Sequence, residues 1–426
     1  MKDIPSAYIV VENIIRKEWG RVLATLIKQF QDFELSEDAL QDALLAALST
    51  WQKNGIPDSP STWLLTTAKR NAIDRLRRAR TERGKQAAVL SDTEQEHYIA
   101  DETDDQLDVV IQDERLMLIF ACCHPALPEQ ERVALTLKSI AGMKTSEIAR
   151  AYLVSEETIA QRIVRAKRKI KATNISYKVP EDDQLDERLL SVLTVIYLIF
   201  NEGYSATHGE AFIRKDLCNE AIRLTELLLE LMDDEREVRG LLALLLLHSS
   251  RLQARCSVNG KLIALEQQDR TLWDRELIKR GLSILITTLT GGKKGKMGAF
   301  QIQAAISAAH TAAATYEQTN WREISKLYEE LYKYQPTPVV MLNGAVALSF
   351  AHGPNAGLAA IQQIEQDGDL RIYQPFYAAK ADMLRRAGRI KDALTNYRKA
   401  VELSGNKTER KYLRERLERL ASKLEK

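Results

Sequence analysis

Cysteine and histidine side chains are the first candidates for chemistry in this sequence. Cys122, Cys123 and His124 are consecutive, but adjacent cysteines cannot easily reach one zinc ion together with the next residue, and no second pair lies nearby. The glycine- and lysine-rich segment 290–298 lacks the spacing of a phosphate-binding loop, and no catalytic triad or carboxylate pair can be defended. We therefore expect no enzyme activity, no metal and no cofactor, and we interpret the two cysteines as a buried thiol pair at a helix end.

Charged side chains are more informative, because their distribution is uneven although the net charge is only +2. Residues Lys69–Lys85 contain eight Lys or Arg and two acids, whereas Ser91–Glu114 contain ten acids and no Lys or Arg. Residues Arg162–Lys171 contain six Lys or Arg and no acid. Two basic clusters that flank an acidic connector predict two separate contacts with a polyanion, with solvated helix faces as the alternative.

The elements that carry the first basic cluster are predicted to be helices. Residues 8–52 have apolar positions at helical spacing, with Ser36 as a plausible N-cap of the second helix. Gly and Pro interrupt the pattern at residues 53–60, and a new helix is predicted over residues 61–80. The side chains expected to form its buried stripe are Leu65, Ala68, Ala72, Leu76 and Ala79.

The second basic cluster follows a predicted helix-turn-helix over residues 145–172. Thr145 is expected to cap a short helix, and Ser155 a longer one that buries Ile159, Ile163 and Ala166. The N-terminal half of the longer helix is predicted to present polar side chains to base edges or phosphates, and its basic end is predicted to contact phosphate.

The remaining chain predicts an acidic linker over residues 83–108 and consecutive helices over residues 180–426. A rhythm of small residues near the C-terminus is typical of closely packed helix pairs, as in tetratricopeptide-like repeats, although no clean period runs through the region. No apolar stretch is long enough for a membrane span, no secretory signal is evident, and the four cysteines are too scattered for a disulfide framework. We therefore expect a cytoplasmic protein.

Three segments, in this order and spacing, resemble the conserved regions of extracytoplasmic-function sigma factors of the sigma-70 family: residues 35–51, 59–80 and 145–172. Residues 180–426 are similar to the tetratricopeptide-like extension of one subgroup. The resemblance implies an all-α fold with sigma region 2 at residues 1–82, the acidic linker, sigma region 4 at residues 109–174, and a C-terminal helical domain.

The resemblance also implies partners and site residues. Core RNA polymerase would be contacted on the coiled coil of its largest subunit and on the flap, the coiled coil by Asp38, Gln41 and Asp42. The −10 promoter element would be bound by Arg70, Asn71, Arg75, Arg77 and Arg78. The −35 element would be bound by Glu157, Thr158, Gln161, Arg162, Arg165, Lys167 and Arg168. The C-terminal domain would be regulatory, with a protein or ligand partner and no membrane contact.

Two other classes of function stay open at this point. An autonomous helix-turn-helix regulator with a ligand- or protein-sensing domain would explain residues 145–172 and 180–426, but it would leave residues 37–80 without a role. A nucleic-acid-modifying enzyme would need a catalytic constellation that the sequence does not offer. Co-purification with core polymerase separates the sigma-factor prediction from both alternatives.

Overall fold

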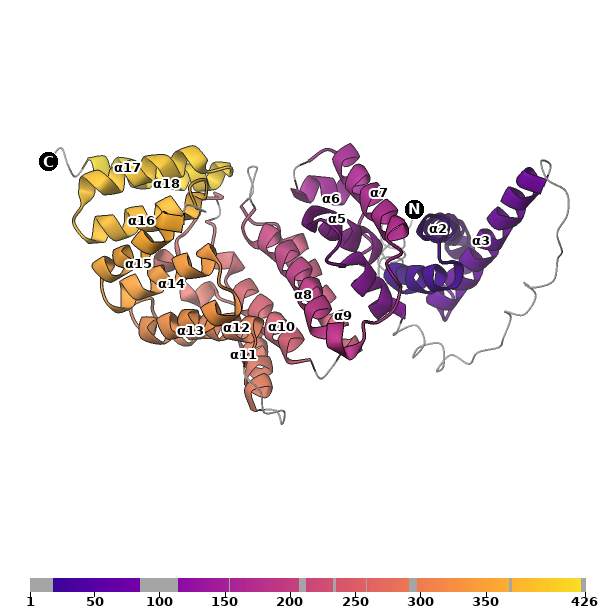
Figure 1. The fold of residues 1–426 in the computed structure, drawn as a ribbon, viewed down its shortest axis with the longest axis horizontal. Helices are drawn as coiled ribbons and strands as arrows, with labels where there is room; N and C mark the ends of the chain where they lie inside the picture. Colours follow the sequence, from indigo (N-terminus) through magenta and orange to yellow (C-terminus); the bar gives the residue numbers. More distant parts are fainter. Residues whose placement is uncertain are drawn as a thin grey trace. The chain divides into compact units, whose positions relative to one another are not determined.

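The computed structural model describes residues 18–84, 114–152, 154–206, 212–232, 235–257, 259–290, 297–367 and 370–422. In these ranges the regular structure is helical, as predicted, apart from an isolated bridge between Cys256 and Leu262 (Figure 1). Residues 85–108 of the predicted acidic linker and residues 291–296 lie outside the described parts. The chain divides into two compact units, Met1–Val195 and Ile196–Lys426, which are described separately.

The first unit contains a helical hairpin of α2 (Phe33–Asn54) and α3 (Pro60–Gly84), preceded by a helical segment over residues 18–30. Alanines let the two helices approach closely, because a methyl group leaves room for the partner helix. Near the turn, the rings of Trp51 and Trp63 meet edge to face at 5.5 Å. The residues buried in the hairpin include Ala39, Leu40, Ala43, Leu64, Leu65, Ala68 and Ala72.

Two local predictions for this hairpin are wrong. The N-cap of α2 is Asp32, whose side chain accepts a hydrogen bond from the Leu35 amide at 3.0 Å, so Ser36 lies inside the helix and is buried. Leu76 is 38% exposed rather than buried. Arg75 lies opposite Asp38, close to the start of α2. The turns of α3 that follow Arg75 therefore have no surface of α2 to pack against.

The second part of this unit holds the predicted helix-turn-helix. It is formed by α6 (Thr145–Tyr152) and α7 (Glu156–Ala172), which pack on α5 (Glu129–Ser139); a helical segment over residues 114–122 precedes α5. The Ser155 side chain accepts a hydrogen bond from the Thr158 amide at 3.1 Å, which confirms the predicted cap. Ile159, Ile163 and Ala166 are buried, as their spacing predicted.

Helix α8 (Asp182–Tyr204) contains the division between the two units. Its first half belongs to the first unit, where Ser191 Oγ donates to the Cys123 carbonyl oxygen at 2.6 Å and accepts from Arg132 at 2.6 Å. Cys122 and Cys123 are both fully buried beside this contact, as predicted for a structural thiol pair.

The second unit is a succession of helices and short 3-10 turns. Its elements are α9 (Lys215–Leu231), α10 (Arg236–Ser249), η1 (Leu252–Ala254), η2 (Leu265–Gln267), η3 (Arg270–Leu272), α11 (Arg275–Thr290), α12 (Ala299–Ala312), α13 (Trp321–Tyr334), α14 (Pro338–Ala351), α15 (Pro354–Asp367), α16 (Gln374–Arg386), α17 (Ile390–Leu403) and α18 (Lys407–Ala421). Helix α10 is buried along almost its whole length and contacts α9, α11 and α12, so it forms the centre of the first part of this unit.

From α13 to α18, each helix packs against the next one in the chain after a short turn (Figure 1). A Cβ added to Gly357 of α15 would lie 2.4 Å from the Ser349 Cβ of α14, so only glycine allows this approach. Gly388 has a φ of 75° in the turn between α16 and α17, a conformation that favours glycine. Small residues therefore set the spacing of this stack.

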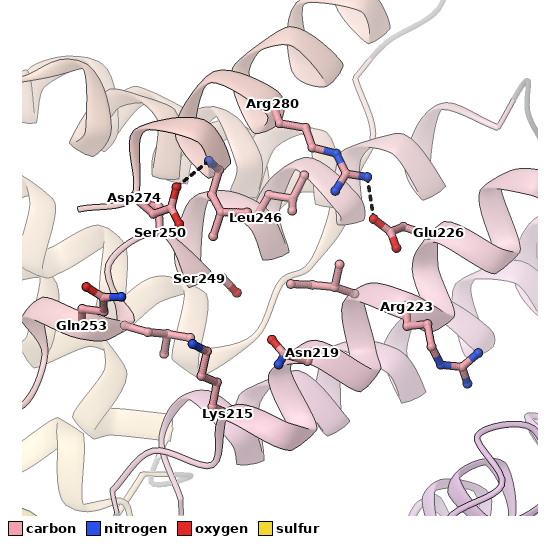
Figure 2. A pocket seen from close by; sticks show the side chains of 13 residues that line it. Lys215, Asn219, Arg223, Glu226, Leu246, Ser249, Ser250, Gln253, Asp274 and Arg280 are labelled. Atoms are coloured by element: carbon pink, nitrogen blue, oxygen red, sulfur yellow. Dashed lines mark hydrogen bonds and ion pairs between the residues drawn. The ribbon is translucent and has the colours of Figure 1, made fainter. Parts of the chain in front are cut away.

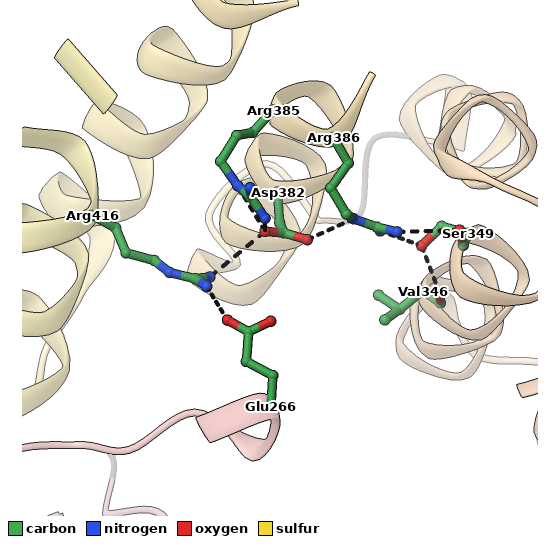
Figure 3. A network of polar contacts seen from close by, with 7 residues as sticks. All are labelled: Glu266, Val346, Ser349, Asp382, Arg385, Arg386 and Arg416. Atoms are coloured by element: carbon green, nitrogen blue, oxygen red, sulfur yellow. Dashed lines mark hydrogen bonds and ion pairs between the residues drawn. The ribbon is translucent and has the colours of Figure 1, made fainter. Parts of the chain in front are cut away.

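A polar network ties distant parts of the second unit together (Figure 3). The carboxylate of Asp382 accepts hydrogen bonds from Arg385 and Arg386 of its own helix and forms an ion pair with Arg416 of α18. Arg386 also donates to Ser349 Oγ of α14 at 2.6 Å, and Arg416 pairs with Glu266 of η2. The network joins α14, α16, α18 and η2, which are far apart in the sequence.

Candidate nucleic-acid interface

Arg75 is the polar centre of the α2–α3 hairpin. Its guanidinium donates to Asp42 Oδ2 from Nε at 3.1 Å and from a terminal nitrogen at 2.7 Å, and it contacts Asp38 Oδ2 at 2.7 Å. These hydrogen bonds, that with Asp42 first, raise the pKa of Arg75. Asp38 and Asp42, which are expected to bind polymerase, are therefore paired with Arg75, which is expected to bind the −10 element. Gln41 on the same helix is exposed.

Asn71 also lies toward α2 rather than away from the hairpin. Its side-chain amide donates to the Ala39 carbonyl oxygen at 3.4 Å, and the residue is half-buried. Asn71 and Arg75, one turn apart on α3, thus both contact α2. The sequence predicted them on a DNA-facing side because spacing alone does not tell which side of a basic helix meets its neighbour.

The other residues predicted to contact the −10 element lie on the solvent-exposed side of α3. Arg70, Arg77 and Arg78 are exposed, and none of them has an ion pair within the described residues. Their side chains form a cluster of positive charge, and no acid of the described residues is within ion-pair distance of it. Such an arrangement suits the phosphates of a nucleic acid, whose contacts release counterions. We call Arg70, Arg77 and Arg78 the α3 arginine face.

Helix α7 presents most of the predicted −35 residues to solvent. Glu157, Gln161, Arg165 and Arg168 are exposed, and Arg162 is half-buried. Thr158 is half-buried, and its hydroxyl lies 2.9 Å from Ser155 Oγ, so this side chain belongs to the helix cap. The capped start and exposed polar side of α7 have the form of a recognition helix that enters a DNA groove.

Lys167 differs from the exposed position expected for it. Its ammonium group forms an ion pair with the carboxylate of Glu37 on α2 and lies 4.9 Å from the ring centroid of Phe33. Only 12% of the Lys167 side chain and 8% of the Glu37 side chain are exposed. In this conformation Lys167 holds α7 against α2, and its charge is not available to a phosphate.

Further contacts surround this ion pair. Lys138 of α5 lies 4.0 Å from Glu37 and 5.6 Å from the ring centroid of Trp19. The backbone at Gly20 approaches Ile140 so closely that an added Cβ would lie 2.7 Å from the Ile140 carbonyl oxygen. The hairpin part and the helix-turn-helix part of the first unit therefore pack directly together. Sequence reasoning missed this contact because it depends on how the helices pack, which spacing along the chain does not encode.

The adjacent cysteines singled out in the sequence are buried inside the first unit. Burial raises the pKa of the Cys122 thiol well above its ordinary value and that of Cys123 to about 11, so neither is an activated nucleophile. No group of histidines, cysteines and carboxylates that could hold a metal ion occurs in the described ranges. In the same ranges, no helix has both the length and the apolar character needed to cross a membrane.

Comparison with known protein families agrees with the division of the first unit. Residues 14–82 match the model of sigma-70 region 2, and residues 117–170 match that of sigma-70 region 4. Residues 188–289 match a family of unknown function (DUF6596). No solved structure matches the chain. The hairpin with the α3 arginine face and the helix-turn-helix thus coincide with two regions that sigma factors share.

Two relatives cover different parts of the chain. An uncharacterized protein of Rhizobium meliloti (strain 1021), R00370, is 40% identical over 404 residues, which are 94% of each chain. The ECF RNA polymerase sigma factor SigK of Mycolicibacterium vanbaalenii is 30% identical over 161 residues, which are 35% of this chain and 76% of that protein. With both sigma regions present in order, the chain belongs to the sigma-70 family of RNA polymerase sigma factors and carries a long helical C-terminal extension.

Proposed function

We propose that this protein is an extracytoplasmic-function-type sigma factor that directs core RNA polymerase to promoters with defined −10 and −35 elements. The observation that carries the proposal is the α3 arginine face, which is exposed and has no ion pair within the described residues, together with the capped helix α7 in the same unit. Two unlike DNA-binding elements on one chain suit two unlike promoter elements. Because the transcription machinery of bacteria is cytoplasmic, we expect the protein in the cytoplasm.

Each element has a distinct part in this proposal. The α3 arginine face holds the backbone of the DNA around the −10 element, where strands separate and bases unstack. The exposed side of α7 enters the major groove of the −35 element, with Gln161 and Arg165 closest to base edges and Arg168 on phosphate. Asn71 contacts DNA only if its side-chain amide gives up the hydrogen bond to the Ala39 carbonyl oxygen and bonds to the DNA instead.

Helix α2 provides the contact with core polymerase in this proposal. Asp38, Gln41 and Asp42 lie on one side of α2 and face a basic partner surface on the coiled coil of the largest subunit. Arg75 holds both carboxylates in fixed positions, so it acts as a positioning residue for this contact and not as a primary DNA ligand.

DNA binding by both elements requires the first unit to open. While Lys167 is paired with Glu37, α7 is held on α2 and the two DNA-binding elements cannot move apart. We infer that docking of α2 on polymerase competes with this contact and releases α7 for the −35 element. The second unit is proposed to regulate this activity.

The experiment that tests the proposed function is reconstitution with core RNA polymerase. The purified full chain is expected to co-elute with core enzyme in gel filtration and to give footprints at two sites upstream of a transcription start. A chain that stays separate from core enzyme but protects an operator by itself would instead support the autonomous regulator and reject the sigma-factor proposal.

A further inference from the structure

A pocket lies in the second unit between α9, the end of α10 with η1, and the start of α11 (Figure 2). Its volume is about 300 Å³. This volume is at the lower end of the roughly 300–1,000 Å³ that small-molecule sites occupy in proteins. All its lining residues fall within residues 188–289, for which the matching family gives no function. The size of the pocket suits a molecule of a few non-hydrogen atoms.

The lining combines apolar surface with uncharged hydrogen-bonding groups. Ile222 and Leu246 supply apolar contacts, whereas Asn219, Ser249 and Gln253 supply amide and hydroxyl groups. Figure 2 shows the side chains of Asn219 and Ser249 directed toward the middle of the pocket. A mostly apolar cavity with a few convergent polar groups is the usual construction of a small-molecule site.

Ser249 gives an independent indication that the pocket receives a polar ligand. The residue is only 8% exposed, and its hydroxyl has no hydrogen-bond partner in the described structure. A buried hydroxyl without a partner is costly, because it has lost its bonds to water. A polar atom of a ligand in the pocket would supply the missing bond.

The charged groups of the lining fall into two sets. Arg280 and Glu226 pair with each other, and Arg223 pairs with Glu220, so these charges are compensated within the protein. Lys215 has no acidic partner among the described residues. The ammonium group of Lys215 is thus available to a ligand. A carboxylate at the pocket is the second charged group available to a ligand.

That carboxylate belongs to Asp274 at the start of α11. Its Oδ1 accepts a hydrogen bond from the Leu277 amide at 3.0 Å, which leaves Oδ2 for another donor. Figure 2 shows Asp274 at the upper left of the pocket and Lys215 at its lower edge. A ligand with a single charge would be attracted by one of these groups and repelled by the other, whereas a ligand with both charges can be attracted by both.

We propose that this pocket binds a free amino acid. The carboxylate of the amino acid pairs with Lys215, its ammonium group donates to Asp274, and Asn219 and Ser249 bind polar atoms nearer the middle of the pocket. The apolar contacts with Ile222 and Leu246 cover the remaining surface. The second unit then carries a small-molecule site within the same polypeptide as the sigma regions.

The test is thermal melting of the full chain with an equimolar mixture of the protein amino acids, followed by calorimetric titration with each one that contributes. Binding to the folded state alone raises the melting temperature. Lys215→Ala and Asn219→Leu are expected to weaken binding about tenfold or more, since each removes a hydrogen-bonding group. Both residues are exposed, so the variants are expected to fold. Lys279→Ala, an exposed change on α11 outside the pocket, is the matched control and leaves binding unchanged.

Acetate and methylamine each carry one of the two ligand charges and are expected to bind far more weakly than the amino acid. The proposal is overturned if no amino acid changes the melting temperature, if acetate alone binds as well, or if binding survives both Lys215→Ala and Asn219→Leu. The assay contains no polymerase or DNA, so its failure would leave the proposed sigma-factor function untouched.

Discussion

Lys167 of α7 and Glu37 of α2 form an ion pair between residues 130 positions apart in the sequence. Both side chains are nearly buried, so the pair is shielded from solvent and salt. While Lys167 is paired with Glu37, its ammonium group is not available to a phosphate. Under the proposed function, this pair is where Lys167 exchanges Glu37 for a DNA phosphate.

Glu37→Gln tests this exchange. The substitution removes the negative charge that holds Lys167, so the free protein is expected to bind a −35 duplex about tenfold more tightly, since hydrogen bonds to charged groups contribute about 1.5–3 kcal/mol. Fluorescence anisotropy with the duplex, in the absence of polymerase, gives the affinity.

Two controls make the Glu37 result specific. Glu34→Gln removes an exposed acid from the same helix and is expected to have no effect. Lys167→Gln also breaks the pair, but it removes the phosphate ligand as well and is expected to give no gain. Equal affinity of the Glu37 variant and the unmodified protein would show that this contact does not limit DNA binding.

The α3 arginine face predicts a change in the salt dependence of promoter binding. Arg77→Ala with Arg78→Ala is expected to weaken open-complex formation and to lower the slope of log affinity against log salt by about 1.4–1.8, because each lost phosphate contact contributes about 0.7–0.9. Filter binding of the holoenzyme over a range of potassium chloride concentrations measures the slope.

A matched double variant separates this effect from a loss of net charge. Lys279→Ala with Lys391→Ala removes two exposed cations from the second unit and is expected to leave the slope unchanged. An unchanged slope in the arginine variant, or an equal decrease in both variants, would argue against the assignment of the α3 arginine face to DNA.

The acidic side of α2 predicts the contact with core polymerase. Asp38→Ala with Asp42→Ala is expected to weaken association with core enzyme about tenfold, because opposite charges across an interface fix its register. Surface plasmon resonance with immobilised core enzyme gives the affinity. Glu34→Ala on the same helix is the control, and full binding by the double variant would exclude these carboxylates from the interface.

His310 predicts how stability depends on pH. Its burial, with Arg251 and Arg270 nearby, lowers its pKa from 6.5 to about 3. Between these values the unfolded chain binds a proton that the folded chain does not, so stability falls as the pH decreases below 6.5, by at most about 1.4 kcal/mol per pH unit for this group. Buried His248, whose pKa is also lowered, acts in the same direction.

His310→Phe isolates this contribution, since phenylalanine keeps an aromatic ring beside Trp321 and cannot take a proton. Urea unfolding from neutral pH to about pH 4.5 is expected to show the variant losing less stability than the unmodified protein, by about 2 kcal/mol. If the free energy of unfolding depended on pH in the same way for both proteins, His310 would have the same pKa in the folded and unfolded states.

Local structure in the recognition region could be predicted from sequence because short-range physics determines it. Ser155 caps α7, and Ile159 and Ile163 are buried, as residue type and helical spacing require. The cap of α2 was assigned one turn too late, because Asp32 and Ser36 are both good capping residues and only the structure distinguishes them.

Long-range pairing could not be predicted in the same way. The contacts of Lys167 with Glu37 and of Arg75 with Asp42 depend on how helices pack, and periodicity does not encode which polar residue meets which. The pocket beside Ser249 likewise needs three elements that only the fold brings together. The basic sequence pattern therefore predicted the helices α3 and α7, but not which of their cations are paired within the protein.

In vitro transcription of total genomic DNA by core RNA polymerase, with and without this protein, tests the sigma-factor account most directly. Sequencing of the RNA 5′ ends is expected to show discrete start sites that require the protein, share a pair of upstream elements, and are lost with Arg77→Ala and Arg78→Ala. The same start sites with core enzyme alone, or no protein-dependent start sites at all, would contradict it.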